Sequence, residues 1–172
     1  MFGTFDNFPK DIHKEVTFTF SASTKRLQQK LVQILHKLNT QTLNLEEISD
    51  PSVPHCTVII EFGIAETNNF KYLDDEETNK TLKTISKSPL QTMDLLCSIS
   101  YYKTQGEKKT PLRFDYYMIR LNFENNLTTI QISHKRGPRH TSPNDIAYLI
   151  INKINEAFGK KTLRILLENP SA

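Results

Sequence analysis

Residues 134–140, HKRGPRH, are the densest group in this sequence of side chains whose chemistry suits ligand binding. Lys135, Arg136 and Arg139 are cationic, and the Gly-Pro pair between them favours a turn that presents them together. His134 and His140 are expected to add positive charge on mild acidification. Lysine and arginine bind phosphate groups, so the stretch predicts an anion-binding loop.

Three interpretations of this basic loop stay open. It is a solvated loop, a site for an anionic membrane, or a site for nucleic acid or a phosphoprotein. Lysine and arginine near an acidic leaflet each contribute about 1 kcal/mol to membrane binding. No aromatic residue is interleaved with the basic ones, which disfavours stacking on single-stranded nucleic acid.

No pattern of an enzyme, metal site or cofactor site competes with the basic loop. The sequence lacks the HExxH and CxxC metal spacings, the GxSxG elbow, the GxGxxG fingerprint and a Walker loop. The acidic run at 74–77, DDEE, could bind a divalent ion, but it lacks the glycine and the spacing of a calcium loop. We therefore expect a non-enzymatic protein with no catalytic residues, no metal and no cofactor.

Length and composition indicate one domain. The chain has 172 residues, 37% of them hydrophobic, and a formal net charge of only +3. That charge is too small to indicate a nucleic-acid or membrane partner by itself. Cys56 and Cys97 lie in apolar runs and are expected to be reduced core thiols, although the sequence leaves a bridge open. No signal peptide and no transmembrane run of about 20 apolar residues is visible, so we expect a cytoplasmic protein.

The basic loop is expected to follow directly after the second strand of a β-hairpin. Residues 113–123 alternate between two faces, with Tyr117, Ile119, Leu121 and Phe123 on one of them. The turn residues at 124–126, ENN, tolerate left-handed backbone angles, and residues 127–133 alternate again. The hairpin is the clearest fold signal in the chain.

A helix is predicted on each side of the strand-forming region. Residues 24–38 carry an apolar stripe, with Lys25, Arg26 and Lys30 off the stripe on a face that is solvated or extends the cationic surface. Residues 143–158 follow Ser142, an expected N-cap that forms a capping box with Asp145. A glycine after residue 158 is a suitable C-cap.

The remaining segments complete an α+β pattern. Strands are predicted at 15–21, 56–64 and 93–102, and a glycine-centred hairpin loop at 103–110. The segment 65–93 is predicted to be a polar insertion, partly mobile, with a helical turn around Leu82 and Ile85. Phe2, Phe5 and Phe8 form a short helix or an apolar arm. We therefore predict an antiparallel β-sheet with two amphipathic helices packed on one face.

This pattern resembles the kinase-associated 1 (KA1) domain, the C-terminal regulatory domain of kinases in the AMP-activated and MARK-like groups, including fungal septin-associated kinases. The resemblance rests on EVTFTF, TKRLQQKLVQILHKL, FDYYMIRLNFENNLTTIQIS and NDIAYLIINKINEAF, and it involves about 110 of the 172 residues. It implies a single KA1-like domain over residues 1–172, with 65–93 departing from the family's compact form. Such domains have no catalytic motif of their own.

The resemblance implies a regulatory module that binds anionic, phosphatidylserine-like phospholipids at the inner membrane surface. It further implies that the module localises or autoinhibits a kinase domain in the same chain. Only the general position of the family's lipid site applies here, to Lys135, Arg136 and Arg139. The alternative is a protein-interaction scaffold domain in a larger assembly, and nucleic acid is disfavoured as a partner.

Three Ser/Thr-Pro pairs are candidate regulatory phosphorylation sites, at Ser88, Thr110 and Ser142. A phosphate on Ser142 would add a charge of about −1.5 to −2 beside Arg139. We expect it to weaken binding to anionic surfaces without disrupting the following helix, because a helix N-terminus favours negative charge.

Overall fold

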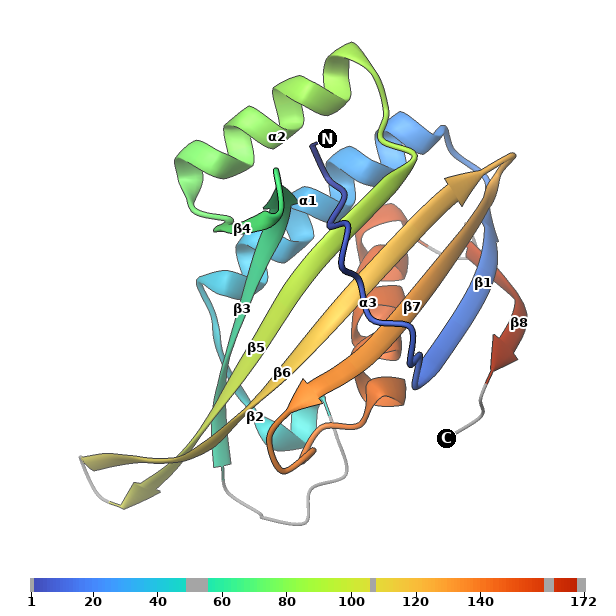
Figure 1. Ribbon diagram of the computed structural model, residues 1–172. Helices are drawn as coiled ribbons and strands as arrows, with labels where there is room; N and C mark the ends of the chain where they lie inside the picture. The colour runs from blue at the N-terminus through green and yellow to red at the C-terminus, as the bar shows by residue number, and fades with distance from the viewer. Residues whose placement is uncertain (1, 49–55, 106–107, 160–162, 170–172) are drawn as a thin grey trace.

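The protein is described here by a computed structural model that covers residues 2–48, 56–105, 108–159 and 163–169, with backbone alone at 104–105 and 108–113. Its sheet is antiparallel throughout and contains eight strands in the order β2-β3-β5-β6-β7-β1-β8, with β4 paired to β3 (Figure 1). The strands are β1 Lys14–Phe20, β2 Thr42–Asn44, β3 Cys56–Glu66, β4 Asn69–Tyr72, β5 Thr92–Gln105, β6 Lys108–Glu124, β7 Leu127–Arg136 and β8 Leu163–Asn169. The predicted α+β class with an antiparallel sheet is confirmed.

Within the described ranges, three helices accompany the sheet: α1 Thr24–Asn39, α2 Asp75–Lys87 and α3 Pro143–Phe158, with a short 3-10 turn at Leu45–Glu47. In Figure 1, α1 and α3 lie behind the sheet, where α1 contacts β3 and α3 contacts β7 and β1. α2 packs against α1. No helix in the described part of the chain is long and apolar enough to span a membrane.

The two predicted helices begin and end where their capping residues indicate. Ser23 caps α1 by accepting a hydrogen bond from the backbone N–H of Arg26 at 3.2 Å. Ser142 and Asp145 form the predicted capping box of α3, and Gly159 follows it with φ of 76°. The two N-caps satisfy backbone N–H groups that a helix start leaves without partners, so these short-range signals set where the helices begin.

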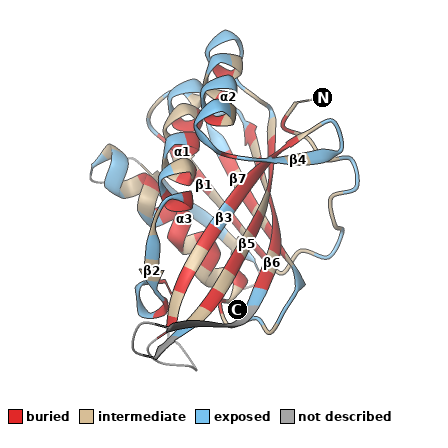
Figure 2. Ribbon diagram, turned by 90° about the vertical axis from the view of Figure 1, so that its left-hand side faces the viewer, coloured by how far each residue is buried: buried red, intermediate tan, exposed pale blue. Residues whose placement is uncertain are grey.

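The core lies between the sheet and the helices, as the buried positions in Figure 2 show. It includes the expected stripes, with Leu31 of α1 and Ile150 of α3 completely buried. Cys56 and Cys97 are buried and free, which confirms two unbridged thiols. Burial raises the pKa of the Cys97 thiol, and the nearby Asp115 charge adds to the shift.

The segment 65–93 contains more regular structure than a helical turn. The turn predicted around Leu82 and Ile85 belongs to α2, a helix of 13 residues. The acidic run at 74–77 forms its N-terminus: Asp74 is the N-cap, and its side chain accepts from the N–H of Glu77 at 2.8 Å. Negative charge is favourable at that end of a helix, which gives the acidic run a structural role.

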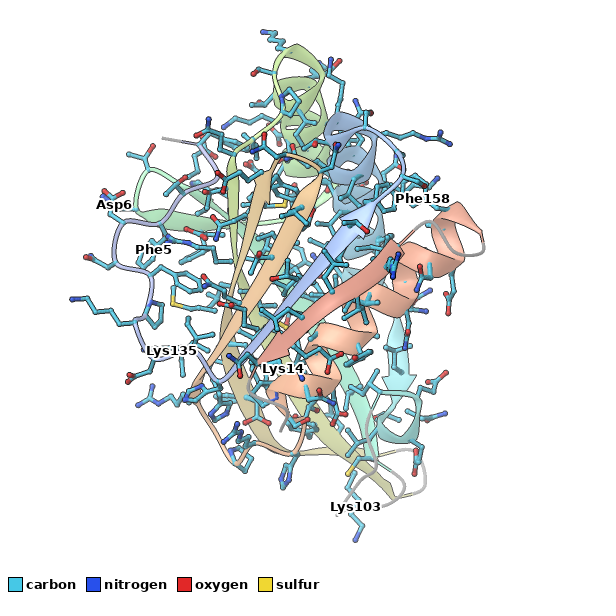
Figure 3. The ribbon with its side chains drawn as sticks, turned by 90° about the vertical axis from the view of Figure 1, so that its right-hand side faces the viewer. Phe5, Asp6, Lys14, Lys103, Lys135 and Phe158 are labelled. Carbon is cyan, nitrogen blue, oxygen red and sulfur yellow. The ribbon has the colours of Figure 1, made fainter. Side chains whose placement is uncertain are left out.

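The N-terminal segment, residues 2–13, is an extended arm on the face of the sheet opposite to α1 and α3 (Figures 1 and 3). Gly3 donates its N–H to the carbonyl of Ala65 and accepts from the N–H of Asp94. The ring of Phe5 packs on that of Phe70, with ring centroids 4.9 Å apart. Of the two alternatives for this segment, the structure shows the apolar arm.

An ion pair with a buried carboxylate holds the arm. The carboxylate of Asp94 is fully buried and accepts two hydrogen bonds from Arg120, at 2.7 and 2.8 Å. The same pair binds both backbone groups of Phe5, through Asp94 Oδ2 at 2.6 Å and Arg120 Nη2 at 3.0 Å. Phe8 places its ring 4.4 Å from the Arg120 guanidinium carbon. One ion pair thus joins β5, β6 and the arm.

Candidate functional site

The candidate site lies where β7 ends and the chain turns into α3. β7 extends to Arg136, so the residues predicted as a loop from 134 onward begin as strand, and the loop proper is 137–141. The predicted loop is too long because β6 continues to pair with β7 at Tyr116 and Arg136. The side chains of Lys135, Arg136 and Arg139 are exposed.

An irregularity in this pairing sends the basic residues and the histidine to different faces of the sheet. Tyr117 is paired with His134 and Tyr116 with Arg136, so Lys135 is an extra residue in β7. Paired residues of antiparallel strands point to the same face. His134 therefore lies on the helix side with Tyr117, and Arg136 lies on the opposite side with Tyr116. Figure 3 shows Lys135 on the side of the sheet where Phe5 and Asp6 lie.

The same pairing places aromatic rings beside the basic residues. Phe114 is 52% exposed, and its ring contacts that of Tyr116 at 5.5 Å between centroids. We call the group Phe114, Tyr116, Lys135, Arg136 and Arg139 the basic–aromatic surface. The sequence showed no aromatic residue within the basic stretch because these rings come from the neighbouring strand.

Beneath this surface, a fully buried carboxylate, that of Asp115, holds the loop. Its Oδ1 accepts from the Arg139 N–H at 2.6 Å and lies 2.8 Å from His134 Nε2. Its Oδ2 accepts from the Tyr101 hydroxyl at 2.6 Å and the His140 N–H at 3.0 Å. Each oxygen thus has two partners, which uses the acceptor capacity of a carboxylate.

Thr141 extends these contacts into the Asp115 cluster, which we define as Tyr101, Asp115, Tyr117, His134 and Thr141. The Tyr101 hydroxyl lies 2.8 Å from Thr141 Oγ1, and Tyr117 donates to the Thr141 carbonyl. Because the single Tyr101 proton goes to Asp115, the Thr141 hydroxyl donates in the first of these bonds. The cluster ties the last residue of the loop to β5 and β6.

Backbone geometry at two loop positions also depends on this contact. Gly137 has φ of 110°, and a side chain there would bring its Cβ within 2.5 Å of Asp115 Oδ1. Arg139 has φ of 62°, a left-handed value that is uncommon outside glycine. The two hydrogen bonds from residues 139 and 140 to Asp115 hold the loop in this conformation.

The histidines take part in internal contacts. The rings of His134 and His140 pack edge-on against Tyr117 and Tyr101 respectively, each with centroids 5.1 Å apart. The backbone N–H of His134 also donates to Nδ1 of His13 at 2.9 Å. The predicted gain of surface charge from His134 and His140 stays a prediction, and the structure turns the His134 ring toward Asp115.

The structure brings together only three of the six predicted lipid-binding residues. Lys25 and Arg26 are exposed at the start of α1, where the Arg26 guanidinium carbon lies 5.4 Å from the ring centroid of Phe158, the last residue of α3. The basic loop precedes the first residue of α3. That helix has 16 residues, so its first residue and Phe158 are about 24 Å apart. Lys30 lies farther along α1, where it lines a groove together with Lys153 of α3. Lys25, Arg26 and Lys30 therefore do not extend the basic loop.

The predicted phosphorylation sites lie apart from one another. Ser88 is exposed as the C-cap of α2, Ser142 is the partly buried N-cap of α3, and Thr110 lies in β6 with its side chain outside the described residues. Phosphorylation at each stays a prediction. Residues 160–161, the two lysines that follow the last predicted helix, also lie outside the described part.

Within the described residues, no three His, Cys, Asp or Glu side chains lie so that they could hold a metal ion. No family model, no curated protein and no solved structure matches the chain. The fold and the site thus define the protein as an α+β domain with an eight-stranded antiparallel sheet and a basic–aromatic surface at one end.

Tyr101 and Tyr117 predict how stability depends on alkaline pH. Burial is the main cause that raises the pKa of both hydroxyls. The hydrogen bond to Asp115 adds to the rise for Tyr101, and the neighbouring Tyr101 and Asp115 add to it for Tyr117. The unfolded chain therefore loses these protons first, near pH 10, while the folded chain retains them. Their contribution to stability is complete below about pH 10 and is lost as pH rises above it.

Urea unfolding between pH 8 and pH 11 checks this expectation. Wild type should lose stability steeply over the upper part of that range, and Tyr101→Phe/Tyr117→Phe should lose less. Tyr116→Phe, on the partly exposed outer face, is the control. Equal slopes for the wild type and the double variant would show that these two hydroxyls do not govern the alkaline transition.

Proposed function

We propose that this chain is a non-catalytic regulatory module that binds anionic phospholipid membranes through the basic–aromatic surface. The observations that support it are the three exposed cations Lys135, Arg136 and Arg139 on one short stretch of chain, and the rings beside them. Arg136 pairs with Tyr116, whose ring contacts the half-exposed ring of Phe114. Cations gain on the order of 1 kcal/mol each near an acidic leaflet. Aromatic rings favour the membrane–water interface, so both parts of the surface suit one partner.

The Asp115 cluster supports the proposal because it fixes the loop before any ligand binds. Both backbone N–H groups at 139 and 140 are occupied internally, which leaves the side chains of the loop to meet the head groups. A preorganised surface loses less conformational entropy on binding than a mobile one.

The resemblance to KA1 domains supports the regulatory part of the proposal. The chain has a first strand leading into an amphipathic helix, antiparallel strands ending in the β6–β7 hairpin, and the helix α3. On this proposal the module acts at the inner membrane surface and localises or restrains a kinase domain in cis.

Charge reversal at the three cations tests the membrane proposal. Lys135→Glu/Arg136→Glu/Arg139→Glu should weaken binding to phosphatidylserine vesicles at least about 100-fold at low salt. Binding by the wild type should fall with added salt, because the attraction is screened within about 8 Å at physiological ionic strength. Vesicle sedimentation measures both effects.

Two further variants make this experiment specific. Lys71→Glu/Lys83→Glu/Lys87→Glu changes the net charge equally at exposed positions elsewhere and should bind as wild type does. Phe114→Ser should weaken binding without any change of charge. Equal binding by the wild type and the triple variant at the basic–aromatic surface would eliminate this site.

The alternative proposal, a protein-interaction scaffold, has one observation in its favour. β8 is an edge strand, and its Ile165, Leu166 and Leu167 are 36%, 51% and 58% exposed. Exposed apolar edge strands are typical of sites that pair with another chain. If the vesicle experiment fails, a partner that covers β8 becomes the better proposal.

A further inference from the structure

A groove between α1 and α3 gathers three lysines away from the basic–aromatic surface. It has a volume of about 410 Å³ and is lined by Lys30 and Lys37 of α1 and by Lys153 of α3. Lys30 and Lys37 form no ion pair within the part of the chain that the structure describes. The volume is within the usual range for small-molecule sites.

The rest of the lining suits a compact anion. Gln33 and Gln41 add side-chain amides that can donate hydrogen bonds, and Ile34, Leu38 and Ala157 add apolar contacts. Among the lining residues that the structure describes, the one acid is Glu156, which is largely exposed and lies 3.5 Å from the Lys153 ammonium group. The three lysines and one glutamate give the described lining of this groove a formal charge of +2.

The groove is distinct from the membrane-binding surface proposed above. Lys153 lies in the C-terminal half of α3, whereas the basic loop precedes that helix. In Figure 2, α1 and α3 lie side by side. Tyr116 and Arg136 of the basic–aromatic surface point to the face of the sheet opposite to these helices. A planar membrane meets a protruding surface more readily than a groove, so the groove suits a discrete ligand.

We propose that this groove binds a compact, multiply charged phosphate anion, with Lys30, Lys37 and Lys153 as its ligands. Three ammonium groups from two helices surround such an anion and supply up to nine donor protons, three from each lysine. The shared chemistry is several phosphate charges in a small volume, from a soluble polyphosphate or from a phosphorylated lipid head group. The proposal is independent of the membrane function.

Isothermal titration with inorganic tripolyphosphate at low salt tests the site. Lys30→Gln/Lys37→Gln/Lys153→Gln should raise the Kd at least about tenfold, because it removes all three cations of the groove. Glu156→Gln should act in the opposite direction and lower the Kd by about threefold, because it removes the acid of the described lining. Both changes alter the charge of the groove and also the net charge of the protein, so each needs a control at another position.

A matched control separates the groove from net charge. Lys71→Gln/Lys83→Gln/Lys87→Gln removes the same number of charges from exposed positions elsewhere and should leave the Kd within about twofold of wild type. If this control weakens binding as much as the groove variant does, the anion is adventitious and the proposal fails. Amide NMR shifts should concentrate at residues 30–41 and 153–157, and shifts confined to 134–140 would overturn it.

Vesicles distinguish the two sources of the anion. If vesicles with phosphatidylinositol bisphosphate bind the wild type better than the groove variant, the ligand belongs to a lipid head group. If only free tripolyphosphate distinguishes the two proteins, the ligand is soluble. The Lys135→Glu/Arg136→Glu/Arg139→Glu variant should retain tripolyphosphate binding, so failure of the membrane proposal and failure of this one give different results. Binding of polyglutamate without tripolyphosphate would overturn the phosphate assignment in favour of an acidic peptide.

Discussion

Replacement of Asp115 by alanine should lower the free energy of unfolding by about 3–5 kcal/mol. The carboxylate is fully buried and is the acceptor for the Tyr101 hydroxyl and the N–H groups of residues 139 and 140. Without it, these donors stay in the interior unpaired, and each unsatisfied buried group costs about 1–3 kcal/mol. Urea unfolding at neutral pH measures the loss.

The same substitution should weaken membrane binding although it removes no cation. The loop would lose the hydrogen bonds that hold Arg139 in its left-handed conformation, so the surface would no longer be preorganised. Asp6→Ala, at an exposed carboxylate on the arm, is the control for both measurements. If Asp115→Ala unfolds at the same urea concentration as the wild type, the cluster contributes little to the free energy of unfolding.

The second large effect is expected at Arg120. Arg120→Ala should cost about 3–5 kcal/mol, because it leaves the Asp94 charge buried without its partner. The Asp94→Ala/Arg120→Ala double variant should lose less than the sum of the two single variants, since no isolated charge then stays in the interior. Chemical unfolding of the four proteins gives the coupling directly.

Loss of Arg120 should also release the N-terminal arm. The Phe5 carbonyl would lose its donor and the Phe8 ring would lose its guanidinium partner. Hydrogen exchange at the Phe5 amide, which donates to Asp94 in the folded protein, should accelerate more than exchange in α3. If the losses in the free energy of unfolding from the Asp94 and Arg120 variants are additive and hydrogen exchange at Phe5 is unchanged, one ion pair does not link the sheet to the arm.

Local signals in the sequence determined the helices and the class of fold. α3 occupies the predicted residues 143–158, because Ser142 and Asp145 cap its start through bonds to near neighbours and Gly159 follows its end with a positive φ. The alternation of β6 and β7 likewise predicted an antiparallel hairpin. Where the local pattern was weaker, at α2, the sequence predicted a single helical turn, and the structure has a helix of 13 residues.

The sequence also identified the basic residues, but only the tertiary structure showed what surrounds them. Asp115 alternates in step with the core residues Tyr117 and Ile119, and this pattern signals that its charged side chain points inward. The pattern does not identify its hydrogen-bond partners, which come from residues 101, 134, 139 and 140.

Strand register decides these contacts. The irregularity beside Tyr116 sends His134 to one face and Arg136 to the other, and the order of the strands brings Asp94 to Arg120. Lys30, Lys37 and Lys153 line one groove because α1 and α3 pack together. Residue type and periodicity are local properties, whereas register and helix packing depend on contacts between residues far apart in the chain.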